Sequence, residues 1–94
     1  MTAIESIRRD YYSAFLGHLI HRNESSLHSG YEIGRAAVVQ DVSMLELATI
    51  HHDVFRRVLA ETPPEEVSEV VSAASEFFVE ILATYHMIHR SAQA

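Results

Sequence analysis

The amino-acid sequence predicts an all-α protein, folded as one four-helix bundle. Apolar residues recur at spacings of three and four along most of the 94 residues, which is the period of an amphipathic helix. Helix-start signals occur at four places and divide the chain into four segments of helical length. No segment alternates apolar and polar residues as a half-buried strand does. A chain of this length corresponds to a single domain, which we assign to residues 1–94.

The first two helices begin at recognisable capping residues. Thr2 and Glu5 have the spacing of a capping box, in which each side chain satisfies a free backbone amide at a helix start. The apolar stripe of this helix consists of Ile4, Ile7, Tyr11, Ala14, Phe15, His18 and Leu19. Asn23 is the predicted N-cap of the second helix. The stripe of the second helix is formed by Leu27, Tyr31 and Val38.

Two glycines, Gly30 and Gly34, lie on the inward side of the second helix. A glycine inside a helix costs roughly 1 kcal/mol relative to alanine, so two of them need a compensating gain. We expect this gain to be the close approach of another helix backbone, in preference to a functional groove.

The third and fourth helices also carry start signals. Ser43 and Glu46 form a predicted capping box for the third helix. Its inward side chains are expected to be Met44, Leu47, Ala48, Phe55, Val58 and Leu59. Thr62, followed by Pro63 and Pro64, is the strongest start, because proline is pre-organised for a first helical turn. The stripe of the fourth helix is Val67, Val70, Val71, Ala74, Phe77, Phe78, Ile81, Leu82, Tyr85 and Ile88. The short connections favour antiparallel neighbours in a compact bundle.

The fourth helix is apolar on a second side as well. Val79, Ala83 and Met87 follow one another at intervals of four, opposite the main stripe. Leu16 and Ile20 likewise lie off the main stripe of the first helix. Scattered surface hydrophobic residues are common, but a helix that is apolar on two sides is usually packed between neighbours. We therefore predict that these five residues form the interface of a symmetric homodimer.

The composition excludes several classes of function. Lysine and arginine number 7 against 13 acidic residues, which gives a formal net charge of −6. Such a surface repels phosphate backbones and anionic lipid headgroups, so neither nucleic acid nor a membrane is expected as the partner. The absence of cysteine excludes disulfides and thiolate chemistry. The N-terminus lacks the apolar segment of a signal peptide, so the expected location is the cytoplasm.

Seven histidines are the most unusual feature of the composition. The pairs His18/His21 and His86/His89 have a spacing at which two imidazoles on a helix can share a metal. However, the Glu-x-x-His and His-Glu-x-x-His signatures are absent, and we assign no metal site and no cofactor. His51 falls in the apolar stripe of the third helix and is expected to be a buried, neutral, hydrogen-bonded histidine. No arrangement of serine, histidine and acid indicates a catalytic site.

Four segments of the sequence, taken together, carry a resemblance to a known protein family. They are Tyr31–Ala37, Met44–His52, Glu76–Glu80 and Tyr85–Arg90. In this order and with these gaps, they resemble the N-terminal domain of RsbU-type phosphatases. The resemblance extends from about Tyr12 to Arg90 and so covers nearly the whole chain.

This resemblance implies a four-helix domain similar in fold to the C-terminal domain of the clock protein KaiA. It also implies a dimer in which helices of two chains pack together, and a domain without catalysis of its own. Members of the family receive a kinase-like switch protein of the RsbT type. They pass that event to a serine phosphatase of the bacterial general stress response. The implied partners are therefore a second copy of the chain and an RsbT-like switch protein, in partner-switching control of a sigma factor.

The surface that would receive the switch protein is expected on the exposed side of the second and third helices, at Glu32, Arg35, Glu46 and Arg57. Because the chain ends at Ala94, it is expected to be either the N-terminal domain of a larger regulator or a stand-alone relative. The alternative function is a small-ligand or metal-sensing bundle, which the histidines keep open. A DNA-binding helical domain is disfavoured by the net charge of −6.

Overall fold

The computed structural model describes residues 2–93, and within them it contains four α-helices and one 3₁₀ turn but no strand. The elements are α1 (Ala3–His21), α2 (Glu24–Val39), α3 (Met44–Ala60), the turn η1 (Pro64–Glu66) and α4 (Val67–Gln93). The all-α prediction is therefore confirmed, and each predicted helix is present.

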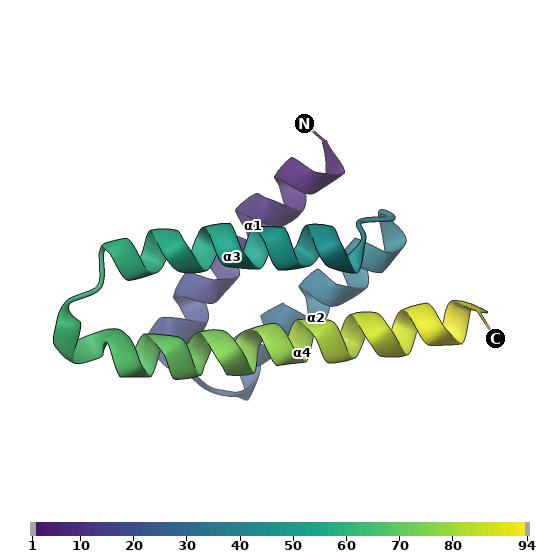
Figure 1. The fold of residues 1–94 in the computed structure, drawn as a ribbon. Helices are drawn as coiled ribbons and strands as arrows, with labels where there is room; N and C mark the ends of the chain where they lie inside the picture. The colour runs from purple at the N-terminus through teal and green to yellow at the C-terminus, as the bar shows by residue number, and fades with distance from the viewer. Residues whose placement is uncertain (1, 94) are drawn as a thin grey trace.

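The helices are arranged in two layers (Figure 1). In one layer, α3 and α4 run antiparallel and are joined through η1. Behind them, α1 and α2 form a V that crosses this pair obliquely. The most extensive contact between two helices is that of α2 with α4. With 27 residues, α4 is the longest helix, and its C-terminal end projects beyond the start of α3.

Three of the four predicted caps form. The Glu5 backbone N–H donates to Thr2 Oγ1 (3.1 Å), which is one of the two bonds of the capping box predicted there. The Ser26 N–H donates to Asn23 Oδ1 (2.9 Å). At the start of α3, the Glu46 N–H donates to Ser43 Oγ and the Ser43 N–H donates to Glu46 Oε2, so this capping box is complete.

The predicted start at Thr62 is wrong in its detail. The Thr62 hydroxyl donates to the carbonyl of Val58 at 2.7 Å, so it closes the end of α3 and does not cap α4. Pro63 stands at the N-cap position of η1 and makes no side-chain capping bond. The two prolines do fix the chain for a turn, but that turn is a 3₁₀ turn that leads into α4.

The core is continuous and contains side chains from all four helices: Ile7, Tyr11, Phe15, Ile33, Ala37, Val42, Leu47, Ile50, Val54, Val58, Val70, Ala74, Phe77 and Ile81. Four side chains that were expected to face inward are exposed: Ile4, Met44, Ala48 and Val71. Ile4 and Met44 lie in the first turns of α1 and α3, at the ends of the bundle. In the third helix, Ile50 and Val54 are buried instead, so its true inward face is rotated from the predicted stripe.

The expected close approach at the two glycines is confirmed. Gly30 and Gly34 are buried, and both face α4. A Cβ atom on Gly34 would lie 2.8 Å from the backbone oxygen of Ile81 and 3.0 Å from Thr84 Cβ. The predicted stripe of Leu27, Tyr31 and Val38 is only half-buried. Because the backbones of α2 and α4 nearly touch, only small side chains fit between them.

No helix within residues 2–93 is both long and apolar enough to span a lipid bilayer.

Candidate functional site

Helix α4 has a buried side and an exposed side. The buried side is formed by Val70, Ala74, Phe77 and Ile81. On the exposed side, Val79 and Met87 keep 62% and 57% of their surface accessible, and Ala83 between them is also exposed. Ser72 and Ser75 continue this side toward the start of the helix. We call these five residues, Ser72, Ser75, Val79, Ala83 and Met87, the α4 outer face.

A shallow groove of about 610 Å³ runs along the α4 outer face. Leu27 of α2 contributes to its lining, as does Arg22 from the α1–α2 connection. Val71, Val79 and Ala83 line it from α4. Apolar surface therefore continues from α4 onto α2, which is the character expected of a protein-interaction surface.

The five predicted dimer positions fall on two helices. Val79, Ala83 and Met87 form one line on the α4 outer face, as predicted. Ile20 lies on α1 and is 77% exposed. Leu16, also on α1, is partly buried and packs against the core. The structure thus brings together the three α4 positions and does not gather all five into a single row.

The four predicted docking positions do not converge on one patch. Glu32 and Arg35 lie on α2 and form a loose ion pair at 4.0 Å. Glu46 is in the first turn of α3, where it caps its own helix. Arg57 is in the last turn, about 16 Å further along the axis. There its guanidinium lies over the ring of Tyr12 on α1, 4.4 Å from the centroid.

A polar cluster around the buried His18 joins three helices, and no pattern in the sequence connects its members. His18 is 1% exposed and stacks on Phe77. Its Nδ1 is 2.8 Å from the hydroxyl of Ser26 on α2, and its Nε2 is 2.8 Å from a carboxylate oxygen of Glu76 on α4. Arg22 Nε donates to the same carboxylate at 3.0 Å. Hydrogen bonds from Arg22 and then from His18 hold the pKa of Glu76 below its ordinary range.

The order Ser26–His18–Glu76 has the connectivity of a catalytic triad, but its surroundings are those of a helix cap. The Ser26 hydroxyl accepts from the backbone N–H of Asn23 at 3.0 Å and lies 2.9 Å from the Asn23 carbonyl. The Ser26 N–H, which could otherwise help to stabilise an oxyanion, is bonded to Asn23 Oδ1. Ser26 and His18, which would be the nucleophile and the base of a triad, are therefore both engaged in holding α1, α2 and α4 together.

A second histidine, His51, forms a pair with Tyr11. The Tyr11 hydroxyl and His51 Nδ1 are 2.6 Å apart, and the His51 ring stacks on Phe78 at 3.9 Å between centroids. The hydrogen bond inside the bundle is as expected, but His51 is half-buried where full burial was expected. Burial, and secondarily the neighbouring His52, lowers the pKa of His51. Burial likewise raises the pKa of Tyr11.

The lowered pKa of His51 predicts a loss of stability in mild acid. The unfolded chain has an ordinary histidine with a pKa of about 6.5, so it binds a proton more readily than the folded chain does. Stability is therefore complete above about pH 6.5 and falls as the pH drops below it. Urea unfolding at pH 7.5, 6.5 and 5.5 measures this. His51→Gln retains a partner for Tyr11 and should show a smaller fall; an equal fall in both proteins would contradict the assignment.

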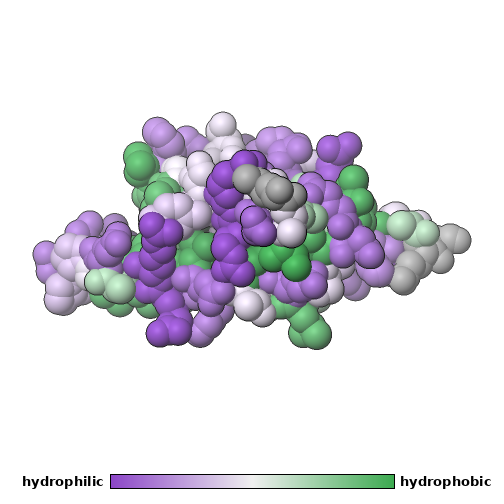
Figure 2. Space-filling view, turned by 90° about the horizontal axis from the view of Figure 1, so that it is seen from above, coloured by the Kyte–Doolittle hydropathy of each residue, from purple (hydrophilic) through white to green (hydrophobic). Residues whose placement is uncertain are grey.

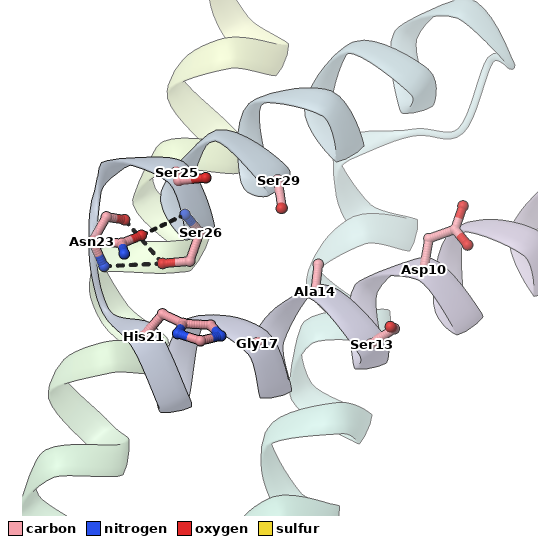
Figure 3. A pocket seen from close by; sticks show the side chains of 9 residues that line it. All are labelled: Asp10, Ser13, Ala14, Gly17, His21, Asn23, Ser25, Ser26 and Ser29. Carbon is pink, nitrogen blue, oxygen red and sulfur yellow. Dashed lines mark hydrogen bonds between the residues drawn. The ribbon is translucent and has the colours of Figure 1, made fainter.

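A polar groove of about 580 Å³ lies between α1 and α2 (Figure 3). Ser13, Ser25, Ser29 and His21 contribute polar groups to it, and Gly17 leaves room on the α1 side. Figure 3 shows Ser29 directed toward the open space between the helices. An activated serine needs a hydrogen-bonded base. Within residues 2–93, His21 makes no hydrogen bond to a serine of this groove.

No group of three or more potential metal ligands comes together in the part of the chain that the structure describes. Both ring nitrogens of His18 are engaged, by Ser26 and by Glu76, so neither is left to share a metal with His21.

Comparison with known protein families gives one match. The family model described as the N-terminal domain of the phosphoserine phosphatase RsbU matches residues 9–88. No match is found among curated proteins or among solved structures. The matched segment includes most of α1, all of α2 and α3, and α4 as far as Ile88. The chain therefore belongs to the family of RsbU N-terminal domains.

Proposed function

We propose that this domain is a non-catalytic dimerisation and docking module of bacterial partner-switching stress signalling. It pairs with a second copy through the α4 outer face and receives a switch protein of the RsbT type in the cytoplasm. It then relays that event to a phosphatase or to another output. Family membership supports a signalling role, since the matched model describes the N-terminal domain and not the phosphatase domain.

The observation that carries the proposed dimer is the line Val79, Ala83 and Met87 on the α4 outer face. Steps of four residues in a helix are about 6 Å long, so the line extends over roughly 12 Å. A small residue, Ala83, lies at its centre, and larger apolar side chains lie at both ends. Two copies that cross at Ala83 would each place Val79 and Met87 beside the other helix, which is the self-complementary arrangement of a two-fold dimer.

Sedimentation equilibrium of the domain and of Met87→Glu tests this proposal. We expect the wild type to be a dimer. A carboxylate buried without a partner costs several kcal/mol, so Met87→Glu should weaken association at least about 100-fold. Leu45→Glu is the matched control, because Leu45 is an equally apolar, 81% exposed residue on another helix. Its association should be unchanged.

A wild-type domain that stays monomeric at high micromolar concentration would refute the dimer. Docking is tested by repeating the sedimentation experiment with an added RsbT-type switch protein. A heavier species containing both proteins is expected, and its absence would refute the docking half of the proposal alone.

A further inference from the structure

The positive charge of this acidic chain is unevenly distributed. All seven basic residues are arginines, and four of them form two adjacent pairs, Arg8–Arg9 and Arg56–Arg57. The first pair lies on α1 and the second on α3, and these helices pack against each other. The face shown in Figure 2 brings strongly hydrophilic groups next to hydrophobic ones. Acidic side chains lie among these arginines, since Asp53 pairs with Arg8 and Asp10 pairs with Arg9.

Between the two pairs lies a groove of about 360 Å³, which we call the arginine groove. Its apolar surface includes Tyr12 of α1 and Val54 of α3. Its charged lining is Glu5, Arg8, Arg9, Asp53 and Arg57. The groove therefore combines a hydrophobic surface with a border of three arginines and two acidic residues, and an amphipathic ligand could use both.

The two best-defined arginines of the groove are held differently. Arg8 donates to Asp53 at 2.7 Å, so an acidic neighbour already balances its charge. The Arg57 guanidinium lies over the Tyr12 ring. Stacking occupies the face of the guanidinium but leaves the N–H groups at its edge free to donate. Within residues 2–93, neither an ion pair nor a hydrogen bond is recorded for Arg57.

We propose that the arginine groove binds an acidic segment of a partner protein. A carboxylate of that segment pairs with the edge of the Arg57 guanidinium, and a neighbouring apolar side chain packs against Tyr12. Glu5 and Asp53 in the same groove disfavour a doubly charged phosphate, whereas a single carboxylate meets less repulsion. The apolar surface in turn suits a side chain that an inorganic anion lacks.

This inference does not depend on the proposed dimer, because the arginine groove and the α4 outer face share no residue. It shares only Arg57 with the docking positions predicted from the sequence. It also does not require the partner to be a switch kinase.

Amide chemical shifts of the ¹⁵N-labelled domain, titrated with a short capped peptide of glutamate, phenylalanine and leucine, test the proposal. We expect saturable shifts at Arg8, Tyr12 and Arg57. The same peptide with glutamine in place of glutamate should bind at least about tenfold more weakly, because the charge-assisted bond is lost. Arg57→Gln should weaken binding of the acidic peptide to a similar extent, and Arg57→Lys should give an intermediate affinity.

Arg35→Gln is the matched control, because Arg35 is an exposed arginine of α2 outside the groove. This change should leave binding unaltered. If inorganic phosphate displaced the peptide at equal concentration, the groove would be an anion site only. Equal binding of the neutral peptide, no shifts in the groove, or an unaffected Arg57→Gln would each overturn the proposal.

Discussion

Replacing Gly34 by alanine is expected to destabilise the domain by about 1–3 kcal/mol, although alanine is the better helix former. The new Cβ atom would lie 2.8 Å from the backbone oxygen of Ile81 and 3.0 Å from Thr84 Cβ. Neither atom is the end of a flexible side chain, so the clash is relieved only by moving α2 away from α4. That movement loosens the most extensive helix contact in the domain. The melting temperature should fall by roughly 4 °C or more.

Gly17→Ala is the control for this experiment. Gly17 is also inside a helix, but no atom lies within 4 Å of its added Cβ. The gain in helix propensity therefore acts alone, and we expect stability to rise by roughly 0.5–1 kcal/mol. Urea denaturation of both variants measures the two effects. If Gly34→Ala were as stable as Gly17→Ala, the close approach of α2 and α4 would be incorrect.

Replacing His18 by alanine is expected to cost about 2–4 kcal/mol. The substitution removes a fully buried ring that stacks on Phe77 and leaves a cavity next to it. It also removes the bonds that connect Ser26 on α2 and Glu76 on α4 through α1. Arg22 still holds Glu76, so we expect the domain to remain folded but to unfold at a lower urea concentration.

His21→Ala is the matched control for His18, because His21 is an exposed histidine one helical turn away. Its loss should change stability by no more than about 0.5 kcal/mol. Equal costs for the two substitutions would show that the polar cluster does not stabilise the fold. Glu76→Gln tests the carboxylate separately, since it keeps the size of the side chain and removes the charge that Arg22 pairs with.

The helices were predictable because their signals are local. Asn23 and Ser43 cap helices through backbone amides only three residues away, so the sequence contains both partners of each bond. Thr62 misled for the same reason. Its hydroxyl can either cap the following helix or donate to the carbonyl of Val58 in the preceding helix, and the sequence does not show which hydrogen bond forms.

The inward faces were less predictable, because they depend on which helix lies opposite. Gly30 and Gly34 were identified as contact points, yet the stripe beside them was placed on larger residues. Large apolar side chains normally indicate the core, but here the face of α2 that meets α4 includes Gly30 and Gly34, which have no side chain.

The site was predictable only where it depends on one helix. The line Val79, Ala83 and Met87 follows from the helical period alone, and the structure leaves all three exposed. The polar cluster depends on residues 58 positions apart, His18 and Glu76, and no local pattern connects them. The stacking of Arg57 on Tyr12 likewise joins two helices and has no counterpart in the sequence.

The contact at Gly34 also has a mechanical consequence. No long side chain lies between Gly34 and the backbone of α4 at Ile81, so no rotamer change there can absorb a displacement. We therefore expect any movement of α4 relative to α2 to be a tilt about this contact. The thirteen residues from Ile81 to the end of α4 at Gln93 form an arm of roughly 18 Å. A tilt of about 10° at the contact would then swing the tip of the arm by about 3 Å.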